Sequence, residues 1–166
     1  MPLLRVVLSA LMLFASLTRS TPACALTLEE LQAEPNLTPA ALLGHFSDFK
    51  FQLRGNTQNP GLFLSSKTGD CDDFANVAAL VLKAKGYTPR IVVVTLENVT
   101  HVVCYVTETR SYLDYNHRRD RTLVPSDGTL PDIAQRVASS FKSRWHSVSE
   151  ITFQAGTRRF VRTEFQ

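Results

Sequence analysis

The segment Gly69-Asp70-Cys71-Asp72-Asp73-Phe74-Ala75 opens an apolar run and predicts the start of a helix. Asp70 suits the N-cap position, and Asp73 stands three residues later, as in a capping box. Gly86 follows as a C-terminal stop. We therefore expect Cys71 in the first turn of a helix that lies buried under a sheet. Its apolar residues recur at helical spacing: Phe74, Val77, Ala78, Val81 and Leu82.

Three apolar, β-branched runs follow this helix and predict an antiparallel meander. The first run is too apolar for an edge strand, so we expect it inside the sheet. His101 lies in the second run and Asp114 in the third. This order indicates an α+β fold in which the helix that carries Cys71 packs on an antiparallel sheet. The three runs cover residues 91–96, 101–107 and 112–115.

The N-terminal part of the chain predicts two short helices and a loop. Residues 26–34 and 39–49 have the apolar spacing of short amphipathic helices. Residues 52–66 are rich in Asn, Gln, Gly and Ser and predict a loop that runs beside a cleft. The core is expected to contain three aromatic side chains from this part: Phe46, Phe49 and Phe51.

The C-terminal part predicts one more helix and a closing hairpin. Pro131 and Asp132 start an amphipathic helix. Residues 150–153 and 158–163 predict two paired strands, joined through residues 154–157. The apolar stripe of the helix has its residues about one turn apart: Ile133, Val137, Phe141 and Trp145.

Cysteine, histidine and aspartate in this order supply the three groups of a thiol-nucleophile site. A cysteine at a helix start meets the positive end of the helix dipole, which favours a thiolate. We predict Cys71 as the nucleophile and His101 as the base that later protonates a leaving amine. Asp114 would accept the other ring N–H and fix the tautomer. Taken singly, a structural cysteine and a hydrogen-bonded strand histidine are the alternative interpretations.

Two further features of the helix start bear on this chemistry. The carboxylates of Asp70, Asp72 and Asp73 oppose a thiolate unless they turn into helix caps or a cation neutralises them. A backbone N–H at the helix start can form half of an oxyanion hole. The polar loop offers Gln52 and Gln58 for the other half, and we favour Gln52.

Residues 1–25 have the composition of a secretory signal. Arg5 precedes an apolar stretch that is too short to span a bilayer, and Ala23-Cys24-Ala25 fits a cleavage site at its end. Lipid attachment at the cysteine of this tripeptide is the alternative. We therefore expect an exported protein, periplasmic or extracellular, with residues 26–166 as a single domain and no membrane span after cleavage.

The charge of the chain predicts no nucleic-acid partner. The leader contains two arginines and no acid, so its removal lowers the formal charge from +3 to +1. Two local clusters of arginine are interpreted as a solvated loop and a solvated strand face, with a site for an anionic partner as the alternative. These clusters are Arg118, Arg119 and Arg121, and Arg158, Arg159 and Arg162.

Two cysteines remain after removal of the leader, and exported proteins often pair such residues. Side chains alternate between the two faces of a strand, so Cys104 and His101, three positions apart, point to opposite faces. If His101 faces Cys71, Cys104 does not. Cys104 is therefore predicted to be a small buried apolar residue and not a disulfide partner.

Residues 69–116 resemble the transglutaminase-like superfamily, papain-related enzymes in which a cysteine-bearing helix packs on an antiparallel sheet. The resemblance rests on the segment around Cys71, the helix end at Lys85-Gly86-Tyr87-Thr88-Pro89-Arg90, and the strands His101-Val102-Val103 and Tyr112-Leu113-Asp114. The pattern is similar to that of bacterial transglutaminase-like cysteine peptidases, which carry an acid on each side of the nucleophile. It implies Cys71, His101 and Asp114 as nucleophile, base and orienting residue.

The resemblance also implies a candidate calcium site. In calcium-dependent periplasmic members of this group, the acids that flank the cysteine help to bind the ion. By position these are Asp70 and Asp72. Calcium takes six to eight oxygen ligands, of which the sequence supplies these two residues. The thiol chemistry itself requires no cofactor.

These observations predict a monomeric, exported thiol acyl-transfer enzyme, foremost a peptidase. Its substrate would be a protein or peptide of the cell envelope, cleaved at a peptide or isopeptide bond. One alternative is a protein-glutamine transamidase, because a lysine amine can replace water in resolving the thioester. Another is a non-catalytic envelope module that keeps the fold and binds a peptide or glycan.

Overall fold

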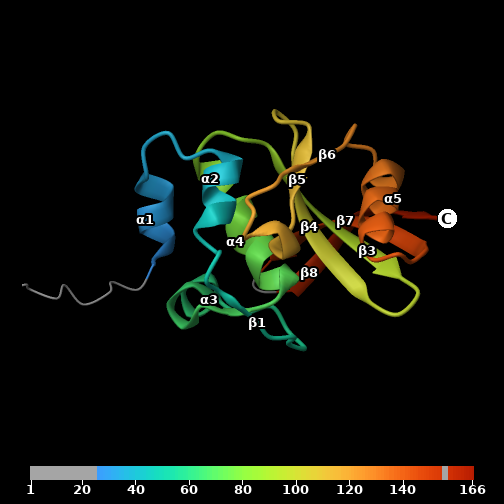
Figure 1. The fold of residues 1–166 in the computed structure, drawn as a ribbon, viewed down its shortest axis with the longest axis horizontal. Coiled ribbons are helices and arrows are strands. Elements are labelled where there is room, and N and C mark those ends of the chain that lie inside the picture. The colour runs from blue at the N-terminus through green and yellow to red at the C-terminus, as the bar shows by residue number, and fades with distance from the viewer. Residues whose placement is uncertain (1–25, 155–156) are drawn as a thin grey trace, which may run out of the picture.

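The computed structural model describes residues 26–154 and 157–166. The predicted signal sequence, residues 1–25, lies outside the described residues. Within them, the main sheet has the strand order β6-β5-β4-β3-β7-β8, and neighbouring strands are antiparallel (Figure 1). Its strands are β3 (Pro89–Leu96), β4 (Thr100–Val106), β5 (Ser111–Leu113), β6 (Val124–Pro125), β7 (Trp145–Gln154) and β8 (Thr157–Phe165).

Helices cover both faces of this sheet. Helices α1 to α4 pack on one face and α5 on the other, as Figure 1 shows. A parallel pair, β1 (Lys50–Phe51) with β2 (Thr68–Gly69), lies beside the start of α4. The helices are α1 (Leu28–Ala33), α2 (Pro39–Gly44), α3 (Pro60–Ser66), α4 (Cys71–Ala84), the 3-10 helix η1 (Tyr115–His117) and α5 (Leu130–Ser140).

The alternation of side chains along β3 explains its unbroken apolar sequence. Ile91 and Val93 belong to the core on the α4 side, whereas Val92 and Val94 belong to the core on the α5 side. A strand that is covered on both faces needs apolar residues at every position. The prediction that this run lies inside the sheet is confirmed, since β3 pairs with β4 on one side and β7 on the other.

Helix α4 begins and ends where its sequence predicts. Asp70 caps it in a capping box with Asp73, and Cys71 is its first residue. The helix ends at Ala84, and Gly86 follows with φ of 85°, a conformation that suits glycine. The helix is buried along most of its length because it lies between the sheet and the N-terminal helices.

A cluster of aromatic rings joins α4 to the segments before it. Phe46 contacts Phe49, Phe63 and Phe74, with ring centroids 4.9, 5.7 and 5.0 Å apart. The expected burial of Phe46 and Phe49 is confirmed. The expected burial of Phe51 is wrong: this side chain is 57% exposed, because β1 is a short outer strand paired only with β2.

Three predicted boundaries are wrong. The stretch 52–66 is not all loop, because Asn59 caps a helix, α3, with Pro60 at its first position. Helix α5 stops at Ser140 and is capped by Phe141, so Trp145 begins strand β7 instead of extending the helical stripe. The third strand of the meander ends at Leu113, and the chain then turns into η1.

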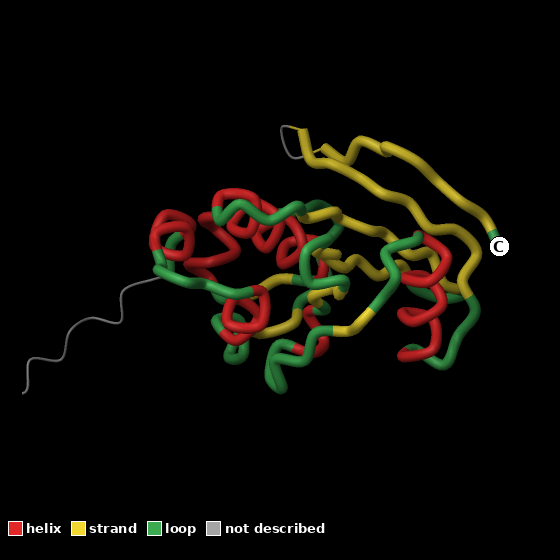
Figure 2. Tube along the Cα trace, turned by 90° about the horizontal axis from the view of Figure 1, so that it is seen from above, coloured by secondary structure: helices red, strands yellow, loops and turns green. Residues whose placement is uncertain are grey.

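The C-terminal hairpin is longer than its sequence pattern predicts. Strands β7 and β8 run side by side along one edge of the sheet as a long ribbon (Figure 2). Residues 155 and 156, at the tip, lie outside the described residues. Strand β8 is exposed over most of its length, as expected for an edge strand.

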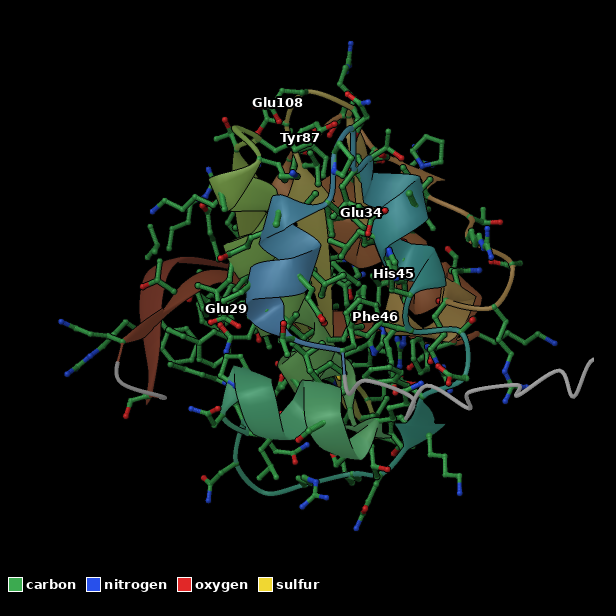
Figure 3. All side chains as sticks on the ribbon, turned by 90° about the vertical axis from the view of Figure 1, so that its left-hand side faces the viewer. Glu29, Glu34, His45, Phe46, Tyr87 and Glu108 are labelled. Atoms are coloured by element: carbon green, nitrogen blue, oxygen red, sulfur yellow. The ribbon has the colours of Figure 1, made fainter. Side chains whose placement is uncertain are left out.

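The two N-terminal helices are tied together at their ends. Glu34, at the end of α1, faces His45, which follows α2 (Figure 3), with 2.8 Å between Glu34 Oε2 and His45 Nε2. This contact braces the helical layer that covers α4. Among the described residues, no helix combines the length and apolar character needed to cross a membrane.

We predict that Phe46→Ala lowers the free energy of unfolding by about 3–5 kcal/mol, because a fully buried ring leaves a cavity among three others. Chemical denaturation measures this loss. Phe165→Ala is the matched control, because that ring is 78% exposed and its removal should change stability by less than about 0.5 kcal/mol. Equal effects of the two substitutions would contradict the aromatic cluster.

Candidate active site

Local structure places Cys71 at the start of α4. Strand β2 ends at Gly69, Asp70 caps the helix, and Cys71 follows as the first helical residue, 8% exposed. A side chain at position 69 would collide with Phe63 and Asp73, so only glycine lets the chain enter the helix here. The first N–H groups of a helix lack partners within it, and that of Cys71 is one of them.

The structure brings the three predicted residues together. His101, the second residue of β4, donates from Nε2 to Asp114 Oδ1 over 2.9 Å. The side chain of Cys71 lies close enough to the ring to raise its pKa. Because Nε2 is taken by Asp114, Nδ1 is the ring nitrogen left for the sulfur. His101 and Asp114 are 5% and 2% exposed, so the pair is shielded from water.

The surroundings of His101 favour its charged form. Burial by itself lowers the pKa of the ring, but the Asp114 carboxylate, its hydrogen bond to the ring and the nearby Cys71 side chain outweigh it and raise the pKa to about 10. Burial acts to raise the pKa of Asp114, yet His101 and the N–H of Asn116 hold that pKa below its usual value. These effects favour an imidazolium that is paired with a carboxylate.

Neighbouring residues fix the orientation of this pair. Asp114 caps η1, and its Oδ1 also accepts the N–H of Asn116 over 2.8 Å. The ring of Phe141, which caps α5, lies 4.9 Å from the His101 ring at an angle of 54°. From its spacing, Phe141 is expected in the helical stripe, and its contact with His101 could not be predicted because the contact depends on where α5 ends.

Cys104 is a buried free thiol, as predicted. Neither it nor Cys71 forms a disulfide, and burial raises the pKa of Cys104 to about 12. The prediction that Cys104 faces away from Cys71 is wrong, however. Cys104 lies in the core on the α4 side, where Cys71 also packs, whereas the His101 ring contacts Phe141 at the opposite face. His101 still reaches Cys71, because it lies near the beginning of its strand.

Two of the three acids at the helix start are turned into caps. Asp70 accepts the N–H of Asp72 at 3.1 Å on Oδ1 and the N–H of Arg54 at 2.8 Å on Oδ2. Asp73 accepts the N–H of Gln58 at 2.6 Å and its side-chain amide at 2.6 Å. Burial raises the pKa of Asp70, against the lowering effect of the Arg54 N–H.

The third acid is paired with an arginine. Asp72 accepts a hydrogen bond on Oδ2 from Arg158 of β8 and is thus neutralised by a cation. Its other oxygen, Oδ1, is buried without a hydrogen-bond partner among the described residues. The sequence pattern favours a solvated strand face for Arg158, and no local signal distinguishes an arginine in solvent from one that pairs with a distant acid.

The two glutamines considered for an oxyanion hole differ in their surroundings. Gln58 uses its side-chain amide on Thr68 O and Asp73 Oδ2, so it holds the loop in place. Gln52 donates its backbone N–H to Gly69 O at 2.8 Å. Because Gly69 lies two positions before Cys71, this bond holds Gln52 near the start of α4. Its Oε1 accepts from Arg54 at 3.3 Å, and Nε2 remains as a donor.

The acids predicted to bind calcium, Asp70 and Asp72, are engaged by protein groups in this structure. Asp70 holds two backbone N–H groups and Asp72 holds a guanidinium. Calcium takes six to eight oxygen ligands. Within residues 26–154 and 157–166, no group of three or more His, Cys, Asp or Glu side chains is arranged to hold a metal ion.

Comparison with known proteins adds a structural neighbour. No family model matches the sequence, and no curated protein matches it. Among solved structures, LapG of Legionella pneumophila, determined with calcium bound, is similar to this chain with a TM-score of 0.51 and 18% identity. The similarity covers 81% of this chain and 74% of LapG. Together with the helix-on-sheet architecture, it shows an α+β fold of the papain/transglutaminase-like kind.

We predict that Asp114→Asn lowers the pKa of His101, because it removes the carboxylate that stabilises the imidazolium. NMR titration of the His101 ring measures this change. In the unsubstituted protein the ring should stay protonated to at least about pH 8. A His101 pKa that Asp114→Asn leaves unchanged would contradict the buried ion pair.

The same pair predicts how stability depends on pH. The pKa of His101 is raised by folding, so its contribution is full below its unfolded pKa of about 6.5 and is lost as pH rises through about 10. The pKa of Asp114 is lowered, so its contribution is present above about pH 4 and is lost as pH falls further. The stability difference between the unsubstituted protein and Asp114→Asn should therefore be largest between about pH 4 and 6.5.

Proposed function

We propose that this protein is a thiol acyl-transfer enzyme, foremost a cysteine peptidase that cleaves a peptide or isopeptide bond. The observation that carries the proposal is the chain of contacts from Asp114 through His101 to Cys71 at a helix start. A buried imidazolium with an orienting carboxylate is what a thiolate nucleophile requires. The α+β fold shared with LapG is consistent with this chemistry.

The geometry supports a two-step reaction. The Cys71 sulfur, as thiolate, attacks the substrate carbonyl carbon and forms a tetrahedral intermediate. The imidazolium of His101 gives its proton to the leaving amine as the carbon–nitrogen bond breaks, and a thioester remains on Cys71. Water, deprotonated by His101, then attacks the thioester, releases the acid and restores the thiolate–imidazolium pair. Asp114 keeps the ring aligned in both steps.

The oxyanion of the intermediate needs hydrogen-bond donors near the sulfur. We propose the backbone N–H of Cys71 and the side-chain amide of Gln52 for this role. Support comes from the position of Cys71 at the helix start and from the bond between Gln52 N–H and Gly69 O. Gln58 is not proposed, because Asp73 and Thr68 engage its amide.

The substrate and the compartment belong to the same proposal. A leader-like sequence at residues 1–25 supports export. The substrate of an exported thiol acyl-transfer enzyme would be a protein or peptide of the cell envelope. We propose that the protein acts there as a monomer. Removal of the leader and secretion of the remaining chain can be followed by N-terminal sequencing of the exported protein.

Two alternatives use the same fold. A protein-glutamine transamidase would resolve the thioester with a lysine amine, and both reactions share the step at Cys71. A non-catalytic module would bind a peptide or glycan near the same helix and leave Cys71 without turnover. The buried His101–Asp114 pair favours an enzyme, because a binding module gains nothing from an imidazolium beside a thiol.

We predict that Cys71→Ala abolishes turnover of a glutamine-containing protein substrate, with a loss of at least about a thousandfold. Mass spectrometry of the products measures it. Cys104→Ala is the matched control, because it removes the other buried thiol without touching the site and should keep activity. If Cys71→Ala were as active as the unsubstituted protein, the enzyme proposal would be lost.

The product distinguishes hydrolysis from transamidation. We expect cleaved or deamidated product both with and without an added primary amine, because water resolves the thioester of a peptidase. An amine-linked product that dominates whenever the amine is present would instead establish the transamidase.

A further inference from the structure

Arg158 brings a positive charge to the helix that carries Cys71 from the far end of the chain. It is the second residue of β8, on the edge hairpin, and lies 86 positions from its partner Asp72. Asp72 is the residue directly after Cys71. Its side chain is 10% exposed and that of Arg158 is 38% exposed, so the guanidinium covers the carboxylate from the solvent side.

Asp72 needs this partner more than its neighbours do. Asp70 and Asp73 are satisfied by N–H groups of the helix and of the segment 54–58. Within the described part of the chain, Asp72 accepts a hydrogen bond from Arg158 alone, on Oδ2, and its Oδ1 is buried without a partner. A buried carboxylate left without a cation is strongly unfavourable, and it would repel a thiolate on the preceding residue.

Arg158 also acts on the second flanking acid. Burial raises the pKa of Asp70, and the positive charge of Arg158 is the weakest of the effects that oppose this rise. One guanidinium therefore pairs with the acid after Cys71 and weakly offsets the burial of the acid before it. These are the two positions that the family resemblance assigns to calcium.

We propose that Arg158 takes the place of a calcium ion as the cation beside Cys71. Arg158 is a positioning residue that acts through Asp72 and does not contact the substrate. The proposal concerns the charge beside the thiol, and it can be tested without assuming that the protein is a peptidase.

The same strand offers a matched control. Arg162 of β8 donates from Nε to Glu150 Oε2 at 3.2 Å, and the same oxygen also accepts a hydrogen bond from Arg90. Arg162 is thus an ion-paired arginine of the same hairpin whose partner lies on β7 and not beside Cys71. A change at Arg162 reports the general cost of losing a surface arginine.

The first measurement is calcium binding by the purified protein. Isothermal titration with CaCl₂ should give no specific binding, and the melting temperature should be equal in CaCl₂ and in a calcium chelator. Calcium binding that Asp72→Asn abolishes would overturn the proposal, because it would show that the carboxylate serves the ion and not Arg158.

The second measurement is the rate at which iodoacetamide alkylates Cys71, followed by peptide mass spectrometry from pH 5 to 9. Arg158→Gln should slow the reaction at pH 6 roughly three- to tenfold and shift the profile to higher pH, the effect of removing one nearby charge. Arg158→Lys should restore most of the rate, and Arg162→Gln should match the unsubstituted protein. An unchanged profile in Arg158→Gln would overturn the proposal. A uniform fall in melting temperature without a shift in the profile would also do so.

Discussion

The capping interactions of Asp70 and Asp73 are the constraint on which the site depends. Each carboxylate accepts one N–H at the start of α4 and another from the segment before the helix, at Arg54 or Gln58. They therefore set where the helix begins and which loop lies beside it. The sulfur of Cys71 is placed by these bonds at the end of the helix dipole that favours an anion. Acids that seemed to oppose a thiolate thus serve to position it.

The antiparallel sheet supplies the other half of the site. Register between β4 and β5 places Cys104 opposite Leu113, so that His101 and Asp114 meet where the two strands separate. Phe141 closes over the ring from the opposite layer. The Asp114 carboxylate and the His101 ring thus meet the Cys71 thiol at the start of α4, next to the ion pair of Asp72 with Arg158. Burial strengthens each of these interactions, because water is excluded.

Much of this arrangement could be predicted from the sequence, and the exceptions have two causes. Helix α4 and the strands around His101 follow from capping residues and apolar spacing, which neighbouring residues encode. Helix α3 was not predicted because the polar residues before it, in the stretch 52–59, outweighed the Asn59-Pro60 signal. The pairing of Arg158 with Asp72 could not be predicted, because an arginine on an edge strand has the same sequence pattern whether it lies in solvent or pairs with a distant acid. Long-range packing decides such cases, and no local rule carries that information.

The central claim is that Cys71 is a nucleophile activated by His101. Its most direct test is acylation by a small activated ester, such as p-nitrophenyl acetate, followed by peptide mapping. We expect an acetyl group on Cys71 and none on Cys104, together with a loss of acylation in His101→Ala. The activation of Cys71 by His101 would be contradicted if the unsubstituted protein gave no adduct at Cys71, or if His101→Ala were acylated at the same rate.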